Sequence, residues 1–92
     1  MEKELENYFS NRNWTINTEE NNVSKDFIFS DFISAFAWMS EIALHAEKLN
    51  HHPEWTNVYN KIKIILKTHD HNKVTNKDLE LAKIMDRSFE KK

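Results

Sequence analysis

The chain contains no glycine, and this absence constrains its turns more than any other feature of the sequence. Glycine adopts left-handed backbone conformations most readily, and asparagine and aspartate tolerate them best among the other residues. Tight turns in this chain are therefore expected at asparagine and aspartate. The clearest candidates are Asn21-Asn22 and the segment Asp70-His71-Asn72-Lys73.

Length and composition narrow the class of protein. The chain has 92 residues, so residues 1–92 are expected to form a single small domain. It has no cysteine, and its net charge of −2 argues against nucleic acid as a partner, because phosphate binding needs a basic surface. No apolar run is long enough to span a bilayer, and the charged first six residues do not resemble a signal peptide. These features predict a cytoplasmic protein that binds neither nucleic acid nor membrane.

Hydrophobic periodicity predicts helices and strands in alternation. The pattern indicates a short helix over residues 2–9, a strand hairpin over 14–17 and 23–29, and a long helix over about 31–50, capped by Ser30. A second pair of strands lies within 55–68, with a turn near Asn60. A capping box, Thr75-Asn76-Lys77-Asp78, opens a last helix. The apolar stripe predicted for the long helix runs through Phe32, Phe36, Met39, Ala43 and Ala46, and it is widened by Ala35, Ile42 and Leu49.

This order of elements favours one fold class. Short hairpin links between neighbouring strands are typical of antiparallel pairing, and interspersed helices must cover the apolar face of the sheet. We therefore expect an α+β fold, with a single four-stranded antiparallel sheet and three helices packed on one face.

Three histidines form the candidate site. His51 and His52 follow the long helix, Pro53 stops that helix, and His69 ends the last predicted strand. Histidine exchanges protons near neutral pH, so this set predicts acid–base chemistry. Two alternatives compete. The adjacent pair fits an exposed helix end, where the helix dipole favours imidazole, and His69 with His71 fits a zinc site. No second shell for zinc is visible, so no metal is expected.

Two carboxylates have a functional and a structural interpretation. Glu47 lies four residues before His51, a spacing that places the two on one helix face, either as an orienting pair or as an ordinary surface pair. Asp78 is either an orienting carboxylate or the third residue of a capping box. Trp55 and Tyr59 fit a core position or the wall of a pocket.

The spacing Glu47-x-x-x-His51-His52-Pro53, followed by Tyr59, His69 and Asp78, resembles the pterin-4a-carbinolamine dehydratase family. Further blocks agree with that family, namely Phe36-Ala37-Trp38-Met39, the run 46–55 and the run 57–61. The resemblance covers about residues 12–89. One departure is Asn72-Lys73-Val74, where members of the family often carry glycine.

The resemblance implies an activity. It implies a dehydratase that converts 4a-hydroxytetrahydrobiopterin to quinonoid dihydropterin and water by histidine acid–base catalysis, without a cofactor. This reaction recycles the pterin of aromatic amino-acid hydroxylases. By resemblance, the catalytic residues are His51, His52 and His69, and the binding or orienting residues are Glu47, Pro53, Trp55 and Asp78.

The resemblance also implies partners. Members of the family are homodimers or homotetramers, in which the sheet extends across subunits and helices pack between dimers. An alternative function is a protein-interaction module, because the family includes a dimerisation cofactor of a transcription factor. The intact histidines favour catalysis over that alternative.

Overall fold

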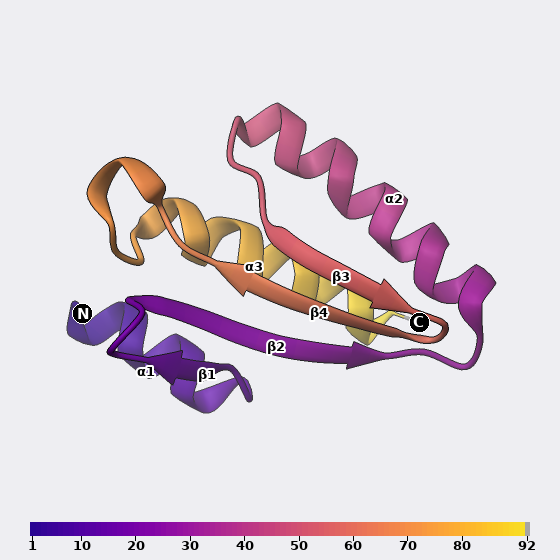
Figure 1. The fold of residues 1–92 in the computed structure, drawn as a ribbon, viewed down its shortest axis with the longest axis horizontal. Coiled ribbons are helices and arrows are strands. Elements are labelled where there is room, and N and C mark those ends of the chain that lie inside the picture. The colour runs from indigo at the N-terminus through magenta and orange to yellow at the C-terminus, as the bar shows by residue number, and fades with distance from the viewer. Residues whose placement is uncertain (92) are drawn as a thin grey trace.

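The computed structural model describes residues 1–91 and contains three α-helices, four strands and one short 3₁₀ helix (Figure 1). These elements run along the chain in the order α1 (Lys3–Asn11), β1 (Thr15–Asn17), β2 (Asn22–Ile28), α2 (Phe32–Leu49), β3 (Glu54–Val58), β4 (Lys61–Leu66), the 3₁₀ helix (His69–His71) and α3 (Asn76–Glu90). Each helix and strand lies within a few residues of the range that periodicity predicts.

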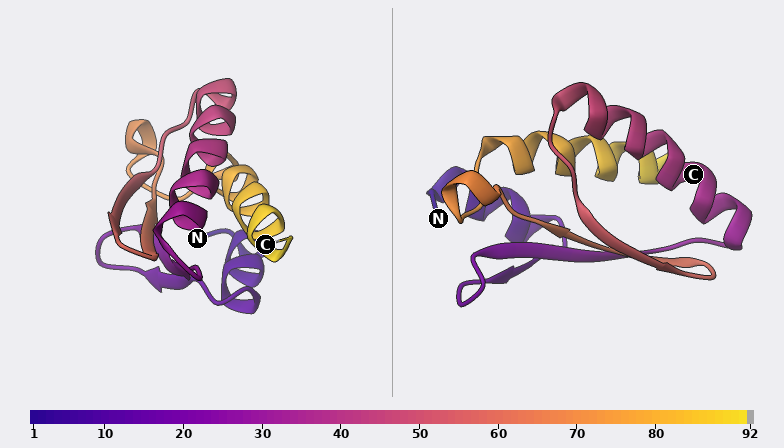
Figure 2. Two further views of the ribbon diagram at one scale, coloured as in Figure 1. Left: turned by 90° about the vertical axis from the view of Figure 1, so that its right-hand side faces the viewer. Right: turned by 45° about the horizontal axis from the view of Figure 1, so that its top comes forward.

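The strands form one sheet in the order β1-β2-β4-β3, and every neighbouring pair is antiparallel. Two hairpins therefore lie side by side, joined where β2 pairs with β4. In that register Val23 faces Leu66 and Phe27 faces Ile62, and all four side chains are fully buried. Figure 2 shows the three helices on one side of this sheet. The predicted α+β fold is confirmed.

Asparagine takes over the turns that glycine would usually make. Five residues between 1 and 91 have a positive φ, and four of them are asparagines: Asn13, Asn21, Asn50 and Asn72. The turns expected at Asn21 and at Asn72 are confirmed. The fifth is Tyr59, which opens the turn between β3 and β4 with a φ of 51°. A bulky residue is strained in that region of backbone space.

The long helix begins one residue later than expected. Asp31, and not Ser30, caps it, because the Asp31 carboxylate accepts the backbone N–H of Ser34 at 2.7 Å. This hydrogen bond lowers the pKa of Asp31 below its ordinary value. At the other end, Asn50 adopts the left-handed conformation that closes many helices.

The buried stripe of α2 is rotated relative to the predicted one. Phe32 and Phe36 are 47% and 53% exposed, whereas Trp38 is fully buried against Phe27 and Phe29. The expectation that Phe32, Phe36 and Ala43 face the core is wrong. The helix is apolar around most of its circumference, so periodicity alone does not select the inner face. The buried residues of α2 are Ala35, Trp38, Ile42 and Ala46, and all of them except Trp38 belong to the predicted stripe.

The last helix, α3, begins with the predicted capping box. Thr75 accepts a backbone N–H of the first turn through its side chain, and Asp78 accepts the backbone N–H of Thr75, so both halves of the box are present. Ala82 and Met85 are fully buried. Within the described residues, no helix combines the length and the apolar character needed to cross a membrane.

Candidate active site

The adjacent histidines leave the end of α2 in different environments. The helix ends at Leu49, and the left-handed backbone of Asn50 turns the chain before the pair begins. His51 is 9% exposed, whereas the side chain of His52 is 59% exposed. Consecutive residues in an extended segment point in opposite directions, which explains the split. The two imidazoles therefore have separate partners.

His51 pairs with a buried carboxylate. Its Nε2 lies 2.5 Å from Oδ1 of Asp78, which is fully buried at the start of α3. The other oxygen, Oδ2, accepts hydrogen bonds from Thr68 Oγ1 at 2.7 Å and from the backbone N–H of Thr75 at 2.9 Å. The two interpretations of Asp78 are thus compatible, since one oxygen caps the helix and the other contacts a histidine.

His52 pairs with Glu47 at the surface. Its Nε2 lies 2.9 Å from Oε1 of Glu47, and the side chain of Glu47 is 81% exposed. The expected contact between Glu47 and His51 is wrong, because the helical spacing of four residues no longer holds once the helix ends at Leu49. An exposed pair of this kind contributes little to stability. It limits the orientations of the imidazole.

His52 and His69 share a small hollow of about 120 Å³, which Ile65 of β4 also lines. Side chains alternate along a strand, so Ile65 lies on the opposite face of the sheet from the buried Ile64 and Leu66. His69 is the first residue of the 3₁₀ helix, beyond the end of β4, so the strand ends earlier than predicted. The two histidines lie 17 positions apart in the sequence and are brought together by the β3–β4 hairpin. The other lining residues are Glu20, Asn22, Glu54, Ile65 and Lys67.

Sequence reasoning missed four polar residues of this hollow. Glu54 and Lys67 could have been found, because strand alternation and the pairing of Glu54 with Ile65 place them on the face that carries Ile65. Glu20 comes from the turn between β1 and β2, and Asn22 is the first residue of β2. No local pattern connects that turn with residues 52–69, since the contact depends on β2 pairing with β4.

The remaining predicted site residues do not line this hollow. His51 and Asp78 contact each other and are not among its lining residues, and Glu47 is linked to it through His52. Trp55 pairs with Ile64 across the sheet and packs half-buried against the core, on the face that the helices cover. Pro53 is also half-buried, and it directly follows the histidine pair in the chain.

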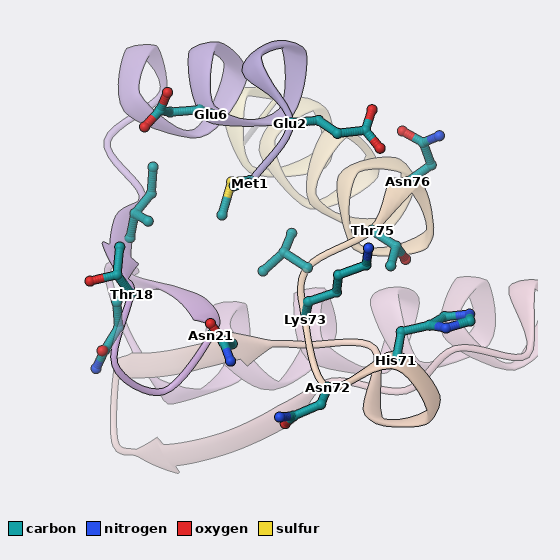
Figure 3. A pocket seen from close by; sticks show the side chains of 13 residues that line it. Met1, Glu2, Glu6, Thr18, Asn21, His71, Asn72, Lys73, Thr75 and Asn76 are labelled. Atoms are coloured by element: carbon teal, nitrogen blue, oxygen red, sulfur yellow. The ribbon is translucent and has the colours of Figure 1, made fainter.

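A larger cavity of about 740 Å³ lies elsewhere, between the start of α1, the β1–β2 turn and the loop before α3. Figure 3 shows Glu6, Thr18 and Asn21 along one side of it and His71, Thr75 and Asn76 along the other. It contains none of His51, His52 and His69. The volume alone favours this cavity as a binding site, but the smaller hollow holds the residues able to exchange protons.

Metal binding was an alternative for His69 and His71. Between residues 1 and 91, no three side chains of histidine, aspartate or glutamate come together in an arrangement that could hold a metal ion. His69 lines the small hollow, and His71 lines the larger cavity.

The sequence matches the family model of pterin 4 alpha carbinolamine dehydratase over residues 1–88. This match spans nearly the whole chain and includes the histidines, Glu47 and Asp78. The chain belongs to this family of dehydratase enzymes, as the resemblance indicated.

Individual relatives agree with the family match. The chain is 48% identical over 75 residues to a protein of Rhizobium rhizogenes, with 82% of this chain and 74% of that protein covered. It is 46% identical over 77 residues to a protein of Prochlorococcus marinus, with 84% and 79% covered. The names of both relatives assign them provisionally to pterin-4-alpha-carbinolamine dehydratase.

A solved structure has the same fold. A transcriptional coactivator/pterin dehydratase from Brucella melitensis superposes with a TM-score of 0.87 and 36% sequence identity, and the match covers 96% of each chain. The arrangement of helices and strands described above is therefore shared over almost the full length of both proteins.

Proposed function

We propose that this protein dehydrates a 4a-hydroxytetrahydropterin to the quinonoid dihydropterin, with His51, His52 and His69 as the proton-transfer groups. In this reaction a base takes the proton from N5, the bond between C4a and the hydroxyl oxygen breaks, and an acid protonates the leaving hydroxyl to give water. The N5–C4a double bond forms from the electron pair of the N–H bond. No oxidant or reductant is needed.

The observation that supports this proposal most is the meeting of His52 and His69 at one hollow. Two imidazoles that reach one ligand can serve as acid and base on its opposite sides, and each contributes most when it exchanges protons near the working pH. The family match supports the pterin as substrate. The roles of Glu47 and Asp78 as orienting groups fit their bonds to His52 and His51.

Pro53 and Trp55 belong to the proposal in a more indirect way. Both are half-buried beside the histidine pair, so we propose that they fix the path of the chain there and do not contact the pterin through the small hollow. The recycling of a hydroxylase cofactor and the cytoplasmic location stay predictions.

The test is a direct assay of 4a-hydroxytetrahydrobiopterin dehydration, followed by the appearance of the quinonoid product. We expect the wild-type protein to accelerate dehydration, and His52→Ala and His69→Ala each to lower the rate at least about tenfold, within the usual worth of acid–base groups. His71→Ala is the matched control, because this exposed histidine is two positions from His69 and lines the other cavity.

Two results would contradict the proposal. A wild-type rate equal to the uncatalysed rate would remove the enzymatic function. A loss of rate in His71→Ala as large as that in His69→Ala would show that the variants perturb the loop and not a site.

We also propose that the chain assembles into homodimers or homotetramers. Four large apolar side chains of α2 are exposed, and β3 is an edge strand with unpaired backbone groups. Natural proteins seldom leave such surfaces uncovered. The large exposed apolar residues of α2 are Phe32, Ile33, Phe36 and Leu44.

The same apolar surface favours the second candidate function, a protein-interaction module. Light scattering distinguishes self-association through this surface from binding to a different partner. We expect the wild-type protein to elute as a dimer or larger species, and the double variant Ile33→Asp with Leu44→Asp to give a smaller one. Both side chains are more than 70% exposed, so the charges should not disturb the fold of the monomer. A monomeric wild-type protein would contradict self-association and favour a different partner.

A further inference from the structure

A chain of hydrogen bonds continues behind the His51–Asp78 pair. Thr68 follows β4 and is 4% exposed, and its Oγ1 donates to Oδ2 of Asp78 at 2.7 Å. The same Oγ1 lies 2.6 Å from Oγ1 of Thr75, the capping residue of α3. The backbone N–H of Lys77 in turn donates to Thr75 Oγ1 at 3.3 Å. Thr68 does not line the hollow that holds His52 and His69.

The hydroxyl protons of this chain have one consistent direction. A threonine hydroxyl has a single proton to donate. Thr68 gives its proton to Asp78, so the short contact between the two hydroxyls requires Thr75 to donate to Thr68. Thr75 Oγ1 is then free to accept from the Lys77 N–H. Every donor in the series points toward Oδ2 of Asp78.

This direction determines where the proton between Asp78 and His51 resides. Oδ2 already accepts from Thr68 Oγ1 and from the Thr75 N–H, so both of its lone pairs are used and this oxygen carries no proton. An ionised carboxylate only accepts hydrogen bonds. Nε2 of His51 must therefore carry the proton that it shares with Oδ1.

The other ring nitrogen of His51 is the one that solvent reaches. Among the described residues, the one buried side-chain nitrogen or oxygen without a partner is Nε1 of Trp38. Nδ1 of His51 has no partner within the described chain either, so it must account for part of the small exposed area of this side chain. With Nε2 held by Asp78, Nδ1 is the atom able to exchange a proton with a substrate.

We propose that Thr68 is a positioning residue that fixes His51 in the Nε2–H tautomer, acting through Asp78 and supported by Thr75. The link to catalysis rests on the proposed dehydratase function. Without the Thr68 hydroxyl, Oδ2 keeps a single donor. When Nδ1 of His51 then takes up a proton from solvent, the proton shared with Asp78 can move from Nε2 to Oδ1. The ring is left with its one proton on Nδ1, which blocks the exchanging nitrogen.

The test combines a spectroscopic readout with kinetics. Thr68→Val removes the hydroxyl and keeps the shape, Thr68→Ser keeps the hydroxyl, and Thr56→Val makes the same exchange at an exposed position of β3. Long-range ¹H–¹⁵N spectra of the histidine rings, assigned with His51→Gln, distinguish the two tautomers. Dehydration kinetics are measured on the same samples.

We expect the wild-type His51 to give the Nε2–H pattern and Thr68→Val to give a mixture of tautomers. We expect kcat of Thr68→Val to fall about tenfold, a part of the usual worth of a proton-transfer group, while KM stays within about twofold. Thr68→Ser should restore the wild-type spectrum and most of kcat, and Thr56→Val should change neither.

Several results would overturn the assignment. An Nδ1–H pattern in the wild-type protein would do so without any variant, even if Thr68→Val fails to fold. A Thr68→Val protein with wild-type spectrum and kcat would do so as well, and so would a Thr68→Ser protein as impaired as Thr68→Val. If the wild-type protein does not accelerate dehydration, the proposed function fails, and the spectra still decide whether Thr68 sets the tautomer.

Discussion

Two buried aspartates on α3 are held by the same pattern of bonds but have different partners. Asp78 and Asp86 are 0% and 1% exposed. In each, Oδ2 accepts two uncharged donors and Oδ1 faces a basic nitrogen, which is His51 Nε2 for Asp78 and Lys25 Nζ, at 2.8 Å, for Asp86. The uncharged donors are Thr68 Oγ1 and the Thr75 N–H at Asp78, and the Tyr8 hydroxyl and Trp14 Nε1 at Asp86.

The difference lies in what the basic partner can do. Lysine keeps its proton at neutral pH, so the Asp86 pair ties β2 to α3 permanently, and Tyr8 adds α1 to the same junction. Lys25 also donates to the carbonyl of Arg12 at 2.8 Å, so two of its three N–H donors are used. Histidine can exchange its proton, so the pair at Asp78 can take part in chemistry. Burial of a carboxylate therefore does not by itself indicate an active site. A partner that exchanges its proton near neutral pH, such as histidine, does.

The largest effect is expected when the structural pair is broken with Asp86→Asn. The amide oxygen can keep the bonds from Tyr8 and Trp14, but the amide N–H₂ then faces the ammonium of Lys25, whose side chain is 16% exposed. We expect the free energy of unfolding to fall by about 3 kcal/mol, because one partner of a buried ion pair is removed. Urea unfolding measures the change.

The control for this prediction is Asp26→Asn, on β2, which is the strand that also carries Lys25. Asp26 pairs with Lys61 at 3.6 Å, and both side chains are about half exposed. A change within about 0.5 kcal/mol is expected there. Dehydration activity per folded molecule should be unchanged in Asp86→Asn. A loss of activity in a folded Asp86→Asn protein would mean that the two aspartates are not separate in function.

The same substitution at Asp78 is expected to affect activity more than stability. The amide oxygen can accept from Thr68 and from the Thr75 N–H, which leaves the amide N–H₂ facing Nε2 of His51. The imidazole must then accept at Nε2 and carry its proton at Nδ1. We expect kcat/KM to fall about 10²-fold, as occurs when a catalytic histidine is held in the wrong tautomer, and the free energy of unfolding to fall by only about 1 kcal/mol.

Measuring the free energy of unfolding and the dehydration activity of both Asp→Asn variants distinguishes the roles of the two aspartates. Both replace a buried carboxylate of α3 by an amide of the same shape, so effects of side-chain volume cancel. If Asp78→Asn loses as much stability as Asp86→Asn and keeps its activity, then Asp78 is a structural carboxylate and the His51 pair has no part in the reaction.

The sequence predicted one of these aspartates and not the other. Asp78 belongs to a local pattern, since a capping box needs only Thr75 three residues before it. Asp86 has no such pattern, because its partners Tyr8, Trp14 and Lys25 come from segments that are 61 to 78 positions away. Contacts at that separation depend on how α1 and α3 lie on the sheet, which no periodicity specifies.

The helix end beside the site shows a second limit of sequence reasoning. Pro53 correctly predicted that α2 stops before the histidines, but the partner of Glu47 depended on the residue at which it stops. Because Asn50 is already left-handed, His52 and not His51 meets Glu47. A change of one or two residues in a helix boundary is beyond what the pattern resolves, and here it exchanges the partners of two histidines.

The smallest of the predicted effects concerns Tyr8, which donates to Asp86 at 2.7 Å. Burial raises the pKa of its hydroxyl, and the hydrogen bond to Asp86 and the charge of Asp86 raise it further. Because the folded pKa exceeds the unfolded one, the neutral hydroxyl stabilises the fold fully below about pH 10, and this contribution is lost as pH rises through the folded pKa. Tyr8→Phe should thus lower stability by about 1 kcal/mol at neutral pH.

The pH dependence separates this bond from ordinary packing. We expect the difference in stability between the wild-type protein and Tyr8→Phe to shrink as pH rises above about 10, because only the wild-type protein has this hydroxyl to ionise. Tyr59→Phe is the control, because Tyr59 is 62% exposed at a turn. The difference in the free energy of unfolding between the wild-type protein and Tyr8→Phe could instead stay constant from neutral to alkaline pH. That result would mean that Asp86 is held by Lys25 and Trp14 alone, with one bond fewer than Asp78 has.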